Sequence, residues 1–369
     1  MGRGAAARSE NVLVPEAPRA TNTSDPGRAE ATPLVLAAAL LLAKITAAVV
    51  PPYSPSAPSP FESHWRDGKA ELDGYRYTVI RYGEERQGQA VMVFVTEPMS
   101  ESKRVKVDDP RKDPADTFEA LKLNFVRDFQ TGIYDYNTMV SLFVRSRDFS
   151  PVKLALSAME WCGSVYDESV FEPRRITDTL HSYFEGESGT RILDERPGGL
   201  TEDALFILLR SLRGGEFLAA GARRTVPFLP SPFYRRLGHR EWAWSTAEIE
   251  RLAKRERVQV PAGAFDCDVY VVRPAGGRLG RFWIERAYPH RVVRWAWAPP
   301  AEAQWFMGRD GCDAGELAGS ERLAYWQLNG RGGESYLRAL GLVAGAPVAP
   351  QERRPTRTPP PSRPERARR

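Results

Sequence analysis

Cysteine and histidine are scarce in this chain. Its 369 residues include three cysteines and four histidines. No two cysteines have the C-x-x-C spacing, and no histidines form an H-E-x-x-H motif. Three cysteines are too few for a fold held together by disulfides, and the missing spacings exclude a zinc site built from a local motif. We therefore expect no metal ion and no cofactor.

The chain also has little net charge once its C-terminal segment is set aside. The whole chain carries +5, and residues 351–369 contain seven Arg and two Glu, which account for all of this excess. A body that is neutral overall gives no electrostatic reason to expect a nucleic-acid partner. The Arg- and Pro-rich stretch 346–369 is predicted to be a disordered tail.

An apolar run of the roughly 20 residues that a membrane-spanning helix needs is missing as well. The apolar run PLVLAAALLLA at 33–43 has eleven residues, which suits the core of a signal peptide better than a membrane span. Residues 33–50 are thus predicted to be a signal peptide or, alternatively, an anchor. They follow a disordered lead, 1–32, and precede a Pro- and Ser-rich linker, 51–60. Either alternative predicts an exported, periplasmic or envelope-associated body that contacts a membrane through residues 33–50 only.

Apolar and polar residues alternate with period two over most of the remaining chain. The stretch GYRYTVIRYGEERQGQAVMVFVTE at 74–97 is typical of two strands around a polar turn. We therefore predict a mainly β protein of antiparallel curved sheets, sandwich-like or open-barrel-like, with one or two short helices. Its two halves are expected to be a β half at 61–195 and a helix plus a β half at 196–345.

One segment has the features of a helix. The stretch TEDALFILLRSLRGG at 201–215 offers Thr201 as an N-cap and Gly214 as a terminator. Its leucines recur at helical spacing, a pattern that indicates an apolar stripe packed against the core.

Several stretches resemble an uncharacterised family of bacterial secreted proteins and lipoproteins. They are KAELDGYRYTVIRYGEERQGQAVMVFVTEPMS, EWCG, VPAGAFDCDVYVV and FWIERAYPHRVVRW. Members often carry the label "septum formation inhibitor Maf", but the chain lacks the Ser-x-Ser-Pro-Arg-Arg signature of the Maf nucleotide pyrophosphatases. The resemblance covers about residues 62–343 and implies a β-rich fold and an exported location, without an activity. Lys44 stands where the lipoprotein members have their lipid-bearing cysteine.

Cys162, in SAMEWCGSV, is the candidate nucleophile. If one strand runs through KLALSAMEWCGSV, then Glu160 and Cys162 share a face, and His181 on the following strand can lie opposite the thiol. A neighbouring imidazole would lower the pKa of the thiol, as a catalytic cysteine requires. The alternatives are a disulfide with Cys267 or Cys312, and a buried structural thiol. We favour the buried thiol because free cysteine is among the most buried residue types.

Two pairs of tryptophans are candidates for binding a ligand. Each pair has the i, i+2 spacing that places two indoles on one face of a strand, where they either line a pocket or fill the core. Two nearby arginines offer positive charge to an anionic group. The candidate residues are Trp242, Trp244, Trp295, Trp297, Arg291 and Arg294.

These features favour an exported, non-catalytic envelope protein that binds a ligand or a partner on a curved β scaffold. The expected ligand is an apolar or anionic molecule of the cell envelope. A thiol-dependent hydrolase using Cys162 and His181 is one alternative, and a structural surface protein tethered by its basic tail is another. The oligomeric state stays open.

Overall fold

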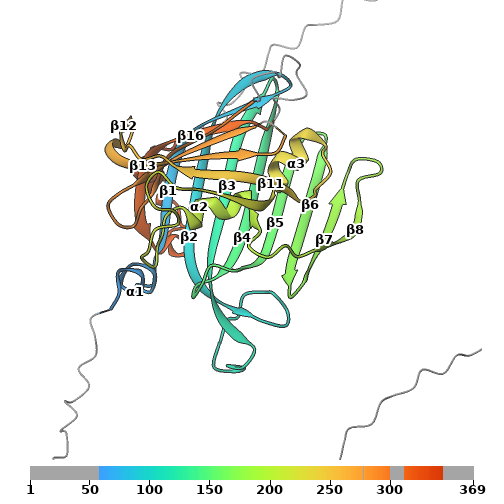
Figure 1. Ribbon diagram of the computed structural model, residues 1–369, viewed down its shortest axis with the longest axis horizontal. Helices are drawn as coiled ribbons and strands as arrows, with labels where there is room; N and C mark the ends of the chain where they lie inside the picture. Colours follow the sequence, from blue (N-terminus) through green and yellow to red (C-terminus); the bar gives the residue numbers. More distant parts are fainter. Residues whose placement is uncertain (1–57, 277, 300–310, 344–369) are drawn as a thin grey trace, which may run out of the picture. The chain divides into compact units, whose positions relative to one another are not determined.

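The computed structural model describes residues 58–276, 278–299 and 311–343. In this part the chain forms a large, curved, non-closed antiparallel sheet with a few short helices, which confirms the predicted fold class (Figure 1). The predicted lead, the signal peptide or anchor, most of the linker and the basic tail lie outside the described residues. Within them no helix is both long and apolar enough to cross a membrane.

The N-terminal half consists of a short helix and eight strands. Ser59 begins the helix with a capping box, in which its hydroxyl accepts from the Glu62 amide and the Glu62 carboxylate accepts from the Ser59 amide. The elements are α1 (Pro60–Trp65), β1 (Ala70–Arg81), β2 (Glu84–Ser100), β3 (Thr117–Thr131), β4 (Tyr134–Arg145), β5 (Pro151–Glu160), β6 (Gly163–Glu172), β7 (Arg175–Ser182) and β8 (Gly189–Asp194).

The C-terminal half has strands of 2 to 12 residues and several short helices. Its elements are β9 (Leu200–Thr201), η1 (Glu202–Ala204), α2 (Leu205–Leu208), β10 (Arg223–Leu229), α3 (Pro232–Gly238), β11 (Ser245–Arg251), β12 (Glu256–Val260), β13 (Gly263–Pro274), β14 (Leu279–Glu285), β15 (Val292–Ala298), β16 (Asp313–Leu323), η3 (Tyr325–Gln327) and η4 (Gly333–Leu340).

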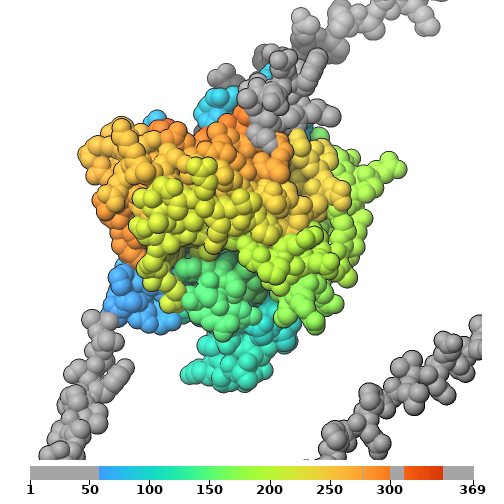
Figure 2. Space-filling view, viewed as in Figure 1, coloured from blue at the N-terminus to red at the C-terminus, as the bar shows by residue number. Residues whose placement is uncertain are grey.

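Both halves belong to one continuous sheet. The strand order is β8-β7-β6-β5-β4-β3-β2-β1-β16-β15-β14-β13-β11-β10-β9, with β12 paired to β13. Every neighbouring pair is antiparallel except β9 and β10, and the pairing of β1 with β16 joins the two halves. The sheet curls so that the C-terminal strands lie in front of the N-terminal strands (Figure 1). In the space-filling view, the side chains of the C-terminal half cover much of the N-terminal strands (Figure 2).

The inward faces of the two layers form the main core. Alternate residues of each strand point inward, so Tyr75 of β1, Phe125 of β3 and Trp295 of β15 are buried together. Their rings meet edge to face, with centroids 4.8 Å apart for Tyr75–Trp295 and 5.2 Å apart for Phe125–Trp295. Phe206 of α2 contacts both Phe125 and Trp295, so this short helix fills the space between the layers.

The predicted helix over 201–215 is shorter in the structure. Thr201 caps it as expected, with its hydroxyl accepting from the Ala204 amide, but the helical residues end at Leu208. Arg210 then turns inward, where its guanidinium donates to Glu71 at 2.6 Å and to the Pro289 carbonyl at 3.0 Å. Ser211 has a φ of 50°, which a continuing α-helix does not allow. The predicted length was therefore wrong because a buried ion pair outweighs helix propensity here.

A second, smaller core lies on the outer face of β1, β2 and β16. Leu340 of η4 packs there against Leu72 and Val93. Two glycines permit this close approach: a Cβ on Gly74 would lie 2.1 Å from the Leu340 carbonyl oxygen, and one on Gly319 would lie 2.1 Å from that of Ala339. Any larger side chain at either position would push η4 off the sheet.

Candidate functional site

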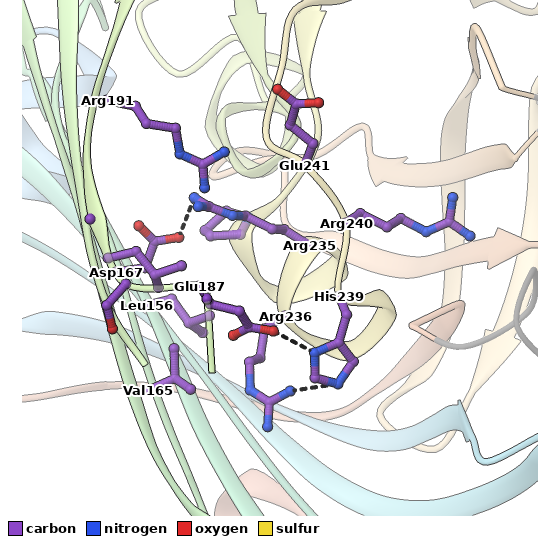
Figure 3. Close-up of a pocket in the computed structure, with 15 residues that line it drawn as sticks. Leu156, Val165, Asp167, Glu187, Arg191, Arg235, Arg236, His239, Arg240 and Glu241 are labelled. Atoms are coloured by element: carbon purple, nitrogen blue, oxygen red, sulfur yellow. Dashed lines mark hydrogen bonds and ion pairs between the residues drawn. The ribbon is translucent and has the colours of Figure 1, made fainter. Parts of the chain in front are cut away.

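A pocket opens between the last strands of the N-terminal half and α3. Its volume is about 420 Å³, within the roughly 300–1,000 Å³ range of small-molecule sites. Strands β5 to β8 form one wall, and α3 with the residues that follow it forms the other (Figure 3). The lining residues are Leu156, Val165, Asp167, Leu180, Gly186, Glu187, Ser188, Gly189, Arg191, Pro232, Arg235, Arg236, His239, Arg240 and Glu241.

The stretch SPFYRRLGH at 231–239 builds the α3 wall. Ser231 caps the helix by accepting from the Phe233 amide, and Pro232 suits the first turn because its missing N–H needs no partner there. The helix ends at Gly238, and His239, which caps it, has the left-handed φ of 47°. This short helix places Arg235 and Arg236 side by side, both almost fully buried.

Arg235 reaches a pair of buried carboxyl groups on the opposite wall. Its Nη1 donates to Asp167 Oδ2 of β6 at 2.9 Å and to Asp178 Oδ2 of β7 at 3.0 Å. Ser169 donates to the other oxygen of Asp178 at 2.9 Å. Arg191 of β8 approaches the same carboxyl group, with its Nε 4.0 Å from Asp178 Oδ2. Two guanidinium groups therefore surround one pair of aspartates.

The two aspartates cannot both ionise easily at this depth. Burial and the charge of Asp178 together raise the pKa of Asp167 to about 8, because Arg235 only partly opposes them. At pH 7 Asp167 is therefore mostly protonated and neutral. The group of Arg191, Arg235, Asp167 and Asp178 then carries one surplus positive charge. Among the described residues, Arg235 Nη2 is buried without a hydrogen-bond partner.

The neighbouring polar side chains beside α3 pair with one another. Arg236 donates to the Glu160 carboxylate, and His239 Nδ1 lies 2.6 Å from Glu187 Oε1 (Figure 3). Burial opposes ionisation of Glu187, but hydrogen bonds from Ser182 and His239 hold the pKa of Glu187 below its usual value. These contacts fix the end of α3 against β5 and the β7–β8 loop.

The strand wall adds apolar surface to the pocket. Leu156, Val165 and Leu180 alternate with the polar residues on the inward faces of β5, β6 and β7, and all three are buried. Pro232 faces them from α3. The pocket thus combines a positively charged group with an apolar wall, an arrangement that suits an organic anion.

The structure places Cys162 differently from the sequence prediction. The paired residues Glu160 and Gly163 close a hairpin, so Trp161 and Cys162 form its two-residue turn and Cys162 is exposed. Our preference for a buried thiol was therefore wrong. The strand reading failed because a hairpin turn interrupts the apparent alternation at this point.

The other members of the proposed thiol site are separated. His181 pairs with Tyr166, further along β6, and is exposed on the outer face of the sheet. Glu160 points inward to Arg236. Because they lie on opposite faces, the sheet does not bring Glu160 and His181 together with Cys162. Cys162 is a free thiol, so it does not form the disulfide considered with Cys267 or Cys312, which are both buried.

The four candidate tryptophans pack in the core or donate hydrogen bonds to backbone carbonyls. Trp295 is fully buried among core rings, and Trp297 is buried against Phe282, with centroids 5.7 Å apart. Trp242 and Trp244 precede β11 instead of lying on a strand, which corrects the expected strand there. Their indole N–H groups donate to the Pro230 and Asp194 carbonyls at 2.7 and 2.8 Å. Both line a shallower pocket beside β8.

The two candidate arginines form ion pairs on the C-terminal layer. Arg291 donates twice to Glu285, at 2.7 and 3.1 Å, and Arg294 donates to Glu316 at 2.6 Å. Neither lines the pocket beside α3. In the described part of the chain, no group of three or more His, Cys, Asp or Glu side chains is arranged to hold a metal ion.

Sequence reasoning missed the residues that converge on the pocket, although a signal for them exists. Asp167 and Asp178 occupy inward positions of their strands, in phase with the apolar Val165 and Leu180. A charged residue in the apolar phase of a strand needs a buried partner. The adjacent arginines of SPFYRRLGH could supply it, but only the fold shows that α3 lies opposite these strands.

Comparison with known proteins adds no relative from which a role could be carried over. No known protein family, no curated protein and no solved structure matches the chain.

Proposed function

We propose that the protein is an exported, ligand-binding module whose pocket beside α3 takes a small organic anion. The observation that carries the proposal is the convergence of two guanidinium groups, Arg191 and Arg235, in this pocket, where Arg235 Nη2 is buried without a hydrogen-bond partner. The pKa of the nearby Asp167 carboxyl group is raised to about 8, so at neutral pH this group offsets the two positive charges only in part. The exported location rests on residues 33–43, which lie outside the described part of the chain.

An anion supplies what this arrangement lacks. A buried charge without a counter-charge is costly, and a buried N–H without an acceptor costs about 1–3 kcal/mol. A carboxylate or phosphate oxygen near Arg235 Nη2 would accept from that group and balance the charge. The apolar wall of Leu156, Val165 and Leu180 favours a ligand that also has an apolar part.

A binding role agrees better with the geometry than a thiol hydrolase does. The exposed Cys162 lies at a hairpin turn, away from His181 and outside the pocket lining. The pocket itself offers arginines and carboxyl groups that already bind one another. Such groups recognise and orient an anion.

The test compares anions with neutral molecules of the same shape. Thermal shifts of the full chain are measured with benzoate, hexanoate and phenyl phosphate, and with benzamide, hexanamide and phenol. At least one anion should stabilise the protein more than its neutral counterpart. Arg191→Gln should weaken that anion about 10- to 100-fold, because a hydrogen bond to a charged group contributes about 1.5–3 kcal/mol.

Arg223→Gln is the matched control. Arg223 is exposed on β10, pairs with Glu248 at 3.9 Å, and does not line the pocket. This variant should bind like the unaltered protein. Equal stabilisation by anions and their neutral counterparts, or equal losses in the two variants, would contradict the proposal.

A further inference from the structure

The hairpin turns at one end of the N-terminal sheet differ in composition from those at the other end. The turns along the upper edge in Figure 1 each carry a large aromatic or aliphatic side chain, whereas those along the lower edge are mostly charged. The upper turns are 82–83, 132–133, 161–162 and 183–188. The lower connections are 101–116, 146–150 and 173–174.

Three of these upper side chains are highly exposed. The exposed fraction is 81% for Ile133, 69% for Trp161 and 66% for Tyr183. Hairpin turns favour Gly, Asn and Asp, so turn geometry does not explain an isoleucine or a tryptophan at these positions. Exposed apolar side chains gathered in one region mark a surface for interaction.

These side chains form a continuous row, which we call the aromatic rim and define as Tyr82, Ile133, Tyr134, Trp161 and Tyr183. The Tyr134 hydroxyl donates to the Tyr82 hydroxyl at 3.1 Å, and the Tyr134 and Trp161 ring centroids are 6.4 Å apart. The Tyr183 ring covers Gly163, the residue after the Trp161–Cys162 turn, where an added Cβ would lie 2.4 Å from the ring. The row therefore crosses four successive hairpins.

The polar side-chain atoms of Tyr82, Tyr134 and Trp161 already have partners within the protein. Trp161 Nε1 donates to Asp135 Oδ1 at 2.9 Å. The Tyr82 hydroxyl lies 2.8 Å from that of Tyr136, in addition to its bond with Tyr134. Removing these groups from bulk water therefore breaks few hydrogen bonds, which lowers the free-energy cost of covering the rim.

We propose that the aromatic rim docks onto the surface of a lipid bilayer. Tyr and Trp have an apolar ring with a polar atom and concentrate at the headgroup level of membranes. Successive hairpins are two strand spacings apart, about 10 Å, so the four turns form a row roughly 30 Å long. A protruding row of turns can enter the headgroup region together. This contact is separate from the anion pocket and from residues 33–50.

The charges around the rim select the kind of lipid. The exposed charged residues next to the turns are acidic: Glu84, Glu85, Asp135 and Glu185. The nearby Arg86 pairs with Glu84 at 2.5 Å. Acidic side chains repel anionic headgroups, so the rim suits a zwitterionic bilayer, and its binding depends little on salt.

Cys162 allows a direct test. It is exposed in the rim turn, whereas Cys267 and Cys312 are buried, so a thiol-reactive, environment-sensitive fluorophore labels the folded full chain at one site. Adding phosphatidylcholine vesicles should shift the emission to the blue and increase it, with and without added salt. Ile133→Ser combined with Tyr183→Ser should weaken this response at least about tenfold, since each removes buried apolar surface.

Two controls make the result specific. In a Cys162→Ser background, Arg147→Cys carries the label in a lower connection and should give no response. Ile192→Ser, which removes an apolar side chain 65% exposed on β8, should leave the response of labelled Cys162 unchanged. Equal responses from both label positions, a response only with phosphatidylglycerol present, or no response to any vesicle would each overturn the proposal.

Discussion

Asp167 links the chemistry of the pocket to pH at the scale of a single residue. Its carboxyl group is buried beside Asp178, and both accept from one nitrogen of Arg235. Protonation of Asp167 leaves the positive charge of Arg191 without a full counter-charge, and ionisation cancels it. The affinity for an anion should thus follow the protonation of this carboxyl group.

Anion binding is predicted to weaken above pH 8. Burial, together with the charge of Asp178, raises the pKa of Asp167 to about 8, so the protonated form prevails below that pH and the ionised form above it. Since the ligand favours protonated Asp167, the dissociation constant should rise by up to about tenfold per pH unit above 8. Asp167→Asn mimics the protonated group and should bind with little pH dependence. Calorimetric titration from pH 6 to 9 measures this, and parallel profiles for both proteins would refute it.

Asp73 is a second buried carboxyl group, with consequences for stability. Burial raises its pKa to about 8, the neighbouring charge of Glu71 acts in the same direction, and Arg210 opposes both. Folded protein therefore keeps a proton that unfolded chains release above about pH 4. Stability contributed by this protonation is complete below pH 4, falls as the pH rises to 8, and stays low above it.

Asp73→Asn is predicted to reduce this loss. The full effect is on the order of 5 kcal/mol if the pKa shifts by about four units. Urea unfolding at pH 5 and pH 8.5 gives the free energy of unfolding of both proteins. The variant should lose less stability between the two pH values, and comparing the proteins removes the contributions of other groups. An identical loss would show that Asp73 is not buried as described.

At the scale of secondary-structure elements, the sequence predicts what local patterns determine and misses what long-range contacts determine. Period-two alternation predicted the strands of 74–97, although both faces of β1 and β2 are buried where η4 covers the outer face. The same alternation concealed the Trp161–Cys162 turn, where both flanking strands keep the pattern. Helix α2 ends early because Arg210 forms an ion pair with Glu71, which is far away in the sequence. Such contacts depend on topology, which residue spacing does not specify.

The pocket also depends on contacts between segments that lie far apart in the sequence. The capping residues Ser231 and Pro232 could indicate a short helix from sequence alone. Their arginines gain a role only where α3 lies opposite β6 and β7, strands that occur more than 50 residues earlier in the chain. Of the two alternatives for the tryptophan pairs, core packing describes Trp295 and Trp297, which are buried, and neither pair indicated the pocket beside α3.

At the scale of the whole molecule, one open sheet forms the core, the anion pocket and the aromatic rim. Its inward faces form the aromatic core, its free side near β8 leaves room for the pocket beside α3, and its upper hairpins carry the aromatic rim. The β7–β8 loop contributes Tyr183 to the rim and Glu187 to the pocket. The pocket therefore lies beside the end of the sheet that we propose faces a bilayer.

The most direct test of the central claim is native mass spectrometry of the full chain purified from the cells that produce it. We predict a bound organic anion that is released on denaturation and retained in Arg223→Gln but lost or depleted in Arg191→Gln. A protein that carries no small molecule, or one that keeps the same neutral molecule in both variants, would contradict the account.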